Sequence, residues 1–223
     1  MNIAIDSANV EVRKRVIHKN FTNEKIIESF SILKRYGINI FNNMILGMPP
    51  LEPNLSESII EDDKSAIDLE IATGVKFSSR SILMPYPGTE IGKWCEDKGY
   101  FKMNVDKFSE SLLERSPLSC FTIEQKDIMK NILYLSGIAV WQPWLAPFIK
   151  KYAIYWRNRL ASKLFLVIYY LVKVYTLKKF IYPIKIKNPI RGLKDFSKGF
   201  WIEVFRVSPG MRKTITYPAP KFR

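Results

Sequence analysis

Histidine and cysteine are scarce in this sequence, and that scarcity excludes several kinds of functional site. The 223 residues contain one histidine, His18, and two cysteines, Cys95 and Cys120, which lie 25 positions apart. Two cysteines form neither a disulfide framework nor a metal-binding signature, so we expect both to be reduced thiols of a cytosolic protein. His18 has no second histidine with which to share a metal ion, so we interpret it as structural.

Long hydrophobic runs are also missing. The longest apolar run covers nine residues, 164–172, and a lysine flanks it on each side. A membrane-spanning helix needs about 20 apolar residues, so we predict no spanning helix, although a helix on a membrane surface stays open. The first residues lack the basic start and apolar stretch of a signal peptide. We therefore expect a cytoplasmic protein that is at most peripheral at the membrane.

Acidic residues are rare in the second half of the chain. Residues 1–110 carry 14 Lys and Arg against 16 Asp and Glu, whereas residues 111–223 carry 21 against five, a net charge of +16. This basic half is also rich in Trp and Tyr, which favours an anionic partner such as a membrane or an acidic protein. Nucleic acid is a weaker expectation, because no recognition motif accompanies the charge.

The first half of the chain alternates strand and helix patterns. Apolar runs at Asn2–Asp6, 38–46 and 75–84 predict strands, and residues 9–19, 22–36, 58–73 and 90–98 have helical spacing. Regular alternation of this kind predicts an α/β fold with a parallel sheet, either open or closed into a barrel. We predict three regions: the α/β part at 1–105, a mainly helical basic region at 106–207, and a mobile tail at 208–223.

The end of the third predicted strand is followed by a stiff loop. Pro85 and Pro87 fix two φ angles and remove two N–H donors, so the strand ends there. Thr89 is a good N-cap for the helix that follows, and Gly99 can end that helix. Ligands of parallel α/β folds bind where strands end in such loops.

Three segments near the ends of the expected strands carry recognisable motifs. They are IAIDS at 3–7 with Arg13 and IHK at 17–19, YGI at 36–38 with MILGMP at 44–49, and PYPGT at 85–89 with KGY at 98–100. In this order and spacing they resemble the strand-end motifs of radical S-adenosylmethionine (SAM) enzymes. PYPGT is most typical of the branch with an N-terminal cobalamin-binding domain.

The resemblance covers roughly residues 1–105 and implies half of an enzyme. Radical SAM enzymes have a partial (β/α)₆ TIM-like barrel and bind a 4Fe–4S cluster through a CxxxCxxC loop after the first strand. The three strands expected here would correspond to the fourth, fifth and sixth strands of that barrel, and the cysteine loop is absent from this sequence. The cluster would then come from a missing N-terminal half or a separate polypeptide, and any cobalamin domain would lie in that missing part.

The resemblance also implies roles for individual residues, each beside a structural alternative. Asp6 would bind the SAM ribose or cap the next helix, and Ser7 would share that pocket or act as an N-cap. Lys19 would pair with the SAM carboxylate or remain solvated. At the second strand end, Ile45 and Gly47 would lie beside the adenine; the alternative is that Ile45 packs in the core and Gly47 forms a turn. At the third strand end, Pro85 and Tyr86 would shape the barrel mouth, or would simply form a stiff loop.

Two departures from the family pattern weaken the implied SAM contacts. The family's glutamate after the fourth strand is the shorter Asp6, and the glycine of its Pro-Gly-Glu turn is Pro50. The expected function is nevertheless the C-terminal portion of a radical SAM enzyme that performs C–H chemistry, including cobalamin-dependent methylation. The alternative is a non-catalytic half-barrel that docks on a membrane or an acidic partner. The two functions are compatible if the substrate of the enzyme is a membrane lipid.

Overall fold

The computed structural model describes residues 1–52, 58–102 and 115–181. The chain divides into a unit of residues 1–185 and a second unit of residues 186–223, which lies outside the described part. The predicted mobile tail at 208–223 therefore falls outside the described residues. The predicted region boundaries at 105 and 207 stay predictions.

Three parallel strands form the sheet, in the order β1, β2, β3. They are β1 (Asn2–Asp6), β2 (Phe41–Leu46) and β3 (Ser78–Ile82), and β2 pairs with both neighbours. The α/β class and the parallel sheet are thus confirmed, whereas closure into a TIM-like barrel stays a prediction. The second strand starts later than predicted because Gly37, at φ +69°, turns the chain and the Ile38 amide bonds back to Leu33.

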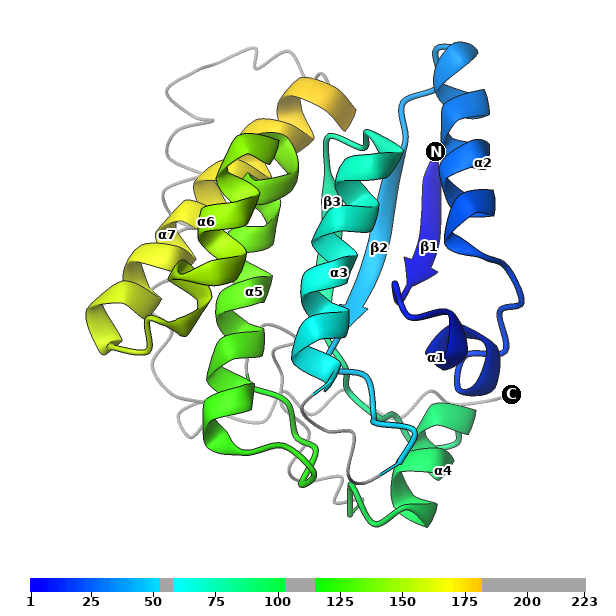
Figure 1. The fold of residues 1–223 in the computed structure, drawn as a ribbon, viewed down its shortest axis with the longest axis vertical. Coiled ribbons are helices and arrows are strands. Elements are labelled where there is room, and N and C mark those ends of the chain that lie inside the picture. The colour runs from blue at the N-terminus through cyan, green and yellow to red at the C-terminus, as the bar shows by residue number, and fades with distance from the viewer. Residues whose placement is uncertain (53–57, 103–114, 182–223) are drawn as a thin grey trace, which may run out of the picture. The chain divides into compact units, whose positions relative to one another are not determined.

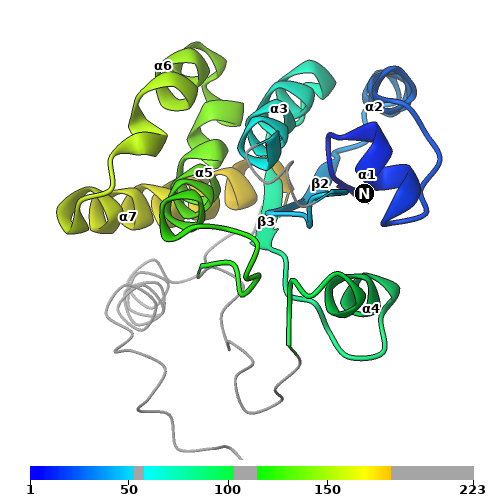
Figure 2. The same ribbon diagram turned by 60° about the horizontal axis from the view of Figure 1, so that its bottom comes forward.

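Four helices accompany the strands, namely α1 (Val10–Arg15), α2 (Asn23–Arg35), α3 (Ser58–Thr73) and α4 (Glu90–Asp97). The Thr22 and Thr89 side chains cap α2 and α4 by accepting bonds from the amides of Lys25 and Gly92. Figure 2 shows α2 and α3 on one face of the sheet and α4 on the opposite side. Only one sheet face is therefore covered by the long helices of this part.

A buried polar network fastens α3 to the sheet. Glu70 of α3 is fully buried and accepts a hydrogen bond of 2.8 Å from the side-chain Nδ2 of Asn42. Its carboxylate also bonds Ser78 and forms an ion pair with Arg80 of β3. Because a buried charge is tolerated only with partners, this network sets the position of α3 over β2 and β3.

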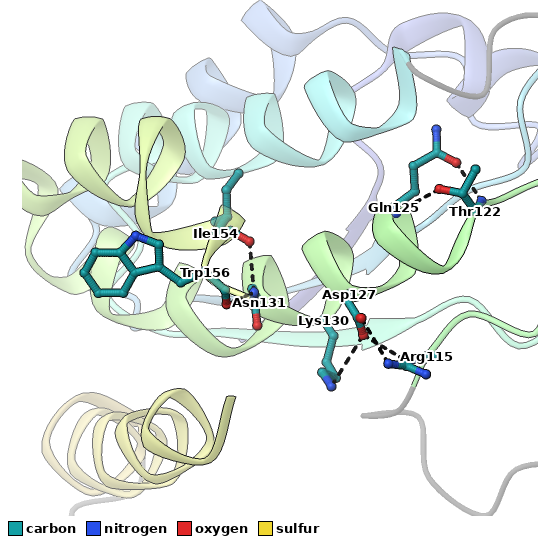
Figure 3. Close-up of polar contacts among 8 residues, drawn as sticks. All are labelled: Arg115, Thr122, Gln125, Asp127, Lys130, Asn131, Ile154 and Trp156. Atoms are coloured by element: carbon teal, nitrogen blue, oxygen red, sulfur yellow. Dashed lines mark hydrogen bonds and ion pairs between the residues drawn. The ribbon is translucent and has the colours of Figure 1, made fainter. Parts of the chain in front are cut away.

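The helical region begins with α5 (Ile123–Trp141), whose first turn is a capping box between Thr122 and Gln125 (Figure 3). In the sequence, residues 122–136 have helical spacing and the glycine after them, Gly137, favours a helix end. That interpretation is wrong, because α5 continues for another turn to Trp141. Gly137 instead gives room to a neighbour, since a Cβ there would lie 3.7 Å from Val172. The glycine serves helix packing and does not end the helix.

The remaining described elements are the helices η3 (Pro143–Leu145), α6 (Ala146–Lys151), η4 (Ala153–Tyr155), α7 (Arg159–Thr176) and η5 (Leu177–Ile181). The helix α7 packs against α5 (Figure 1), and it buries one stripe of side chains: Ala161, Phe165, Tyr169, Val172 and Thr176. Within the predicted region 106–207, the described residues 115–181 are mainly helical, and the rest of that prediction lies outside the described residues.

The nine-residue apolar run lies within a longer helix, so the prediction of no membrane-spanning helix stays a prediction. Within the described residues, one continuous helix of 23 residues, Arg159–Ile181, has the length and composition of a membrane span. Only 28% of its most apolar window is buried, which is little for a core helix. Length and composition alone therefore do not exclude a span.

Candidate functional site

A cavity of about 360 Å³ opens where β2 and β3 end. Its walls come from the end of α1 with Val16 and Ile17, from Ile45 of β2, from the loop after β3 with Tyr86, and from Glu90 at the start of α4. Carboxyl ends of parallel strands are the usual ligand position in α/β folds. The cavity therefore lies where the sequence predicted a site.

A contact between His18 and Glu90 joins the segment after α1 to the start of α4, and Glu90 lines the cavity. The His18 Nε2 atom lies 3.3 Å from a Glu90 carboxylate oxygen, and both side chains are largely exposed. His18 also has a positive φ of 56°, which is uncommon for a residue with a side chain. Its interpretation as structural fits this contact, because the bridge holds the segment after α1 against α4.

Asp6 and Lys19 form an ion pair at the end of β1. The Lys19 Nζ atom donates to Asp6 Oδ2 at 2.5 Å and to the carbonyl of Ala4 at 2.8 Å. The pairing with β2 shifts register between Ala4 and Asp6, and Asp6 has a φ of 67°. The structure thus brings together the two residues expected to bind the ribose and the carboxylate of SAM, but they bond each other and do not line the cavity.

Ser7 lies in a buried turn, and neither it nor Asp6 caps the next helix. The Ser7 hydroxyl accepts a bond of 3.2 Å from the Asn9 amide, and the Ser7 carbonyl accepts one of 2.6 Å from Arg13. The N-cap of α1 is Asn9, whose side chain accepts from the Val12 amide. The capping alternatives for Asp6 and Ser7 were therefore wrong.

Ile45 and Gly47 lie at the same strand end but face different surroundings. Ile45 is partly exposed and lines the cavity, whereas Gly47 is buried and points to α3 and α5. The Gly47 amide donates to both carboxylate oxygens of Asp63 at 3.1 Å, and a Cβ on Gly47 would lie 3.2 Å from the Met129 sulfur. Burial raises the pKa of Asp63 well above its usual value, although the Gly47 amide acts in the opposite direction.

The loop after β3 places Tyr86 in the cavity wall and Pro85 in the interior. The Tyr86 carbonyl accepts a bond of 2.7 Å from the Thr89 hydroxyl, and this closes the loop onto α4. Gly92 makes the close approach feasible, because a Cβ there would lie 2.3 Å from that carbonyl. The sequence reasoning missed Gly92, although a glycine in the first turn of a helix is a recognisable signal of close packing.

The cysteines do not suit an iron–sulfur cluster. Burial raises the pKa of Cys95 to about 12 and that of Cys120 to about 11, so both are neutral thiols at pH 7. A thiolate is the form that binds metal. Across residues 1–52, 58–102 and 115–181, no three His, Cys, Asp or Glu side chains gather as a metal-binding group.

Comparison with known proteins leaves the sequence motifs as the basis for any family assignment. No protein-family model matches the chain, and a search of curated proteins gives no match either. What the geometry adds is the position of the motif residues. Ile45 and Tyr86 come from separate motifs and line one cavity, while Asp6 and Lys19 pair at the neighbouring strand end.

Proposed function

We propose that the strand-end cavity binds the adenosyl part of SAM and that this chain is the C-terminal portion of a radical SAM enzyme. The observation that carries the proposal is the shared cavity of Ile45 and Tyr86, at the carboxyl ends of parallel strands. The segment that leads to Lys19 contributes Val16 and Ile17 to the same cavity. Residues from all three sequence motifs thus meet around one space.

The lining of the cavity suits a purine nucleoside. Val16, Ile17 and Ile45 offer apolar walls for the flat base, and Ser81 offers a hydroxyl group for its polar edge. Bound SAM would supply the adenosyl group from which radical SAM chemistry starts. The part of this chain is to hold the nucleoside and exclude water.

Asp6 and Lys19 can hold the remainder of SAM if their ion pair opens. The Asp6 carboxylate accepts hydrogen bonds, as ribose hydroxyls require, and the Lys19 ammonium suits a carboxylate. The Lys19 side chain is 31% exposed and that of Asp6 is 14% exposed, so ligand groups can reach the pair from solvent. Gly47, Ser7 and Pro85 would act indirectly in this proposal, because they are buried and set the ends of β1, β2 and β3.

The iron–sulfur cluster does not fit this chain, which has two buried or half-buried neutral thiols in place of a CxxxCxxC loop. We therefore assign the cluster, and any cobalamin, to an N-terminal half or to a separate polypeptide. The reaction of the assembled enzyme, radical C–H chemistry that includes methylation, is part of the same proposal. The edge strand β1, whose described partner is β2 alone, is where such a half would join.

Titration calorimetry of the whole chain tests the nucleoside site. SAM, S-adenosylhomocysteine and 5′-deoxyadenosine are each expected to bind, and Ile45→Asp is expected to weaken all three at least about tenfold, because it places a charge in the apolar wall. Ile123→Asp is the matched control, since Ile123 is 70% exposed on α5. Absence of binding by all three ligands would refute the site.

A second candidate function is a half-barrel without catalytic activity that docks on a membrane. The observation that favours it is the exposed apolar surface of α7. The natural reading frame upstream of the Met1 codon separates the two candidates. A CxxxCxxC sequence there, or in a partner polypeptide, supports the enzyme, and its absence from both leaves the docking module.

A further inference from the structure

Exposed apolar side chains concentrate on the segment from η3 to α7. Of the 17 large exposed apolar side chains among the described residues, ten lie between positions 144 and 175: Trp144, Phe148, Tyr152, Tyr155, Trp156, Leu160, Leu164, Leu171, Val174 and Tyr175. Single exposed apolar residues are ordinary, but a concentration of this size marks a surface that contacts something else.

On α7 these side chains form a stripe of their own. Leu160, Leu164, Val167, Leu171 and Val174 recur at alternating spacings of four and three, which places them on one helix face. Leu160, Leu164 and Leu171 are 79%, 54% and 51% exposed. We call these five residues the outer stripe, to distinguish them from the stripe that packs against α5.

The segment that carries the outer stripe has charged side chains of a single sign. Residues 128–181 contain nine Lys and Arg and no Asp or Glu. If the outer stripe paired with that of a second copy, Lys163 and Lys173 would face like charges, which disfavours that pairing. The chemistry that complements apolar side chains flanked by cations is an anionic phospholipid surface.

A basic pocket of about 300 Å³ lies beside the outer stripe, between α5 and the start of α7. Arg115 pairs with Asp127 at 2.7 Å, Lys130 approaches the same carboxylate at 3.7 Å, and Arg157 pairs with Glu124 at 3.1 Å (Figure 3 shows the first two). Arg159 and Lys163 also line the pocket.

In the described part of the chain, neither Arg159 nor Lys163 has an acidic partner. Both lie in the first turns of α7, where free backbone amides add to the positive potential. The pocket thus combines an excess of cationic side chains with enough space for a phosphate group.

The surroundings of α7 favour a position along the membrane surface over a span. Its buried stripe packs on α5, and α5 carries Asp127 and Lys130 beside the first turns of α7. The Asn131 side chain also ties the carbonyls of Ile154 and Trp156 to α5 (Figure 3). Insertion of α7 across a bilayer would carry these charged groups into the hydrocarbon or break the packing.

We propose that α7 binds the surface of an anionic phospholipid membrane. The outer stripe enters the outermost acyl region, while Arg159 and Lys163 of the basic pocket contact a lipid phosphate. The aromatic rings of Trp156 and Tyr175 lie at either end of the helix, and Trp and Tyr favour the headgroup level. This surface is separate from the nucleoside cavity, so neither proposal depends on the other.

Vesicle sedimentation of the full chain tests this surface, with neutral phosphatidylcholine vesicles and with vesicles that contain about 30% phosphatidylglycerol. We expect binding to the anionic vesicles that is at least about tenfold tighter than to the neutral ones, and weaker at about 0.5 M salt than at about 0.1 M. Equal binding to both vesicles, or none to either, overturns the proposal. Retention on the vesicles after an alkaline carbonate wash indicates a span and also overturns it.

Variants of α7 separate this surface from basic residues elsewhere in the chain. Leu164→Gln with Leu171→Gln is expected to reduce binding at least about tenfold, and Arg159→Ala with Lys163→Ala about tenfold or more, at roughly fivefold per charge. Val10→Gln with Ile123→Gln makes the same chemical change at exposed positions outside α7 and is expected to bind as the wild type does.

Unchanged binding by either α7 variant contradicts the proposal, provided that circular dichroism shows the variant to be folded. Light scattering tests the other possible occupant of the outer stripe, a second copy of this chain. If the chain dimerises in solution and the leucine variant is monomeric, the outer stripe is a contact between copies and not a membrane surface.

Discussion

Replacement of Asp63 by Asn is expected to change the pH dependence of stability. Asp63 is buried in α3, and both of its carboxylate oxygens lie 3.1 Å from the Gly47 amide nitrogen. Desolvation raises its pKa well above the usual value, the bond from Gly47 lowers it, and the nearby charge of Asp62 raises it. Asparagine keeps an oxygen that can accept the Gly47 bond but cannot ionise.

The sign follows from proton binding in the two states. The unfolded chain loses the Asp63 proton near pH 4, whereas the folded chain keeps it to a higher pH because its pKa is raised. The stability that this group contributes is therefore fully present below the unfolded pKa and is lost as the pH rises through the folded pKa. Within that window the free energy of unfolding falls by up to about 1.4 kcal/mol per pH unit.

Urea unfolding followed by circular dichroism, from about pH 4 to about pH 7, measures this slope. We expect the stability of the wild type, relative to Asp63→Asn, to decrease steadily across the range, until the variant is the more stable protein. The same change at exposed Asp68, on the same helix, reports what loss of a surface carboxylate does. A constant difference between wild type and Asp63→Asn, or a wild type that gains relative stability with rising pH, refutes the reasoning.

Three further predictions concern the buried network, two glycines and a thiol. Glu70→Gln and Arg80→Met are each expected to lower the free energy of unfolding by about 3–5 kcal/mol in urea titrations, because each leaves a buried charged partner without its counter-charge. A loss below about 1 kcal/mol argues against a buried ion pair. Gly92→Ala is expected to lower the melting temperature, because the added Cβ clashes with a backbone carbonyl. Gly137→Ala should raise or preserve the melting temperature, since alanine gains up to about 1 kcal/mol of helix propensity. A higher melting temperature for Gly92→Ala than for Gly137→Ala contradicts the packing. Cys95, with its pKa of about 12, should resist iodoacetamide near pH 8 until urea unfolds the chain, and rapid labelling of the native protein would show the site to be open.

Local chemistry made much of the fold predictable. Thr22 and Thr89 are helix caps because a hydroxyl accepts from an amide two or three positions on, and Gly37 turns the chain because it tolerates a positive φ. The parallel sheet followed from the order of strands and helices. Gly137 was misjudged because a glycine that ends a helix and a glycine that receives a neighbouring helix look the same in one dimension.

The candidate site was only partly predictable, because motifs specify which strand end a residue occupies but not its partner. Ile45 and Gly47 are two positions apart, yet Ile45 lines the cavity while the Gly47 amide turns to Asp63. The expected ligand groups Asp6 and Lys19 are neighbours, but they bond each other. The partner of each residue depends on contacts between segments that are distant in the chain.

The amino-acid sequence was enough to predict the element types, the parallel sheet, the end of the chain that carries the positive charge and the lack of cluster-binding cysteines. Those properties depend on residues near each other or on composition alone. Which stripe of α7 is buried against α5 and which is exposed depends on the folded packing. Both stripes are apolar at helical spacing, so periodicity cannot distinguish them, whereas the packing of one stripe against α5 leaves the outer stripe exposed.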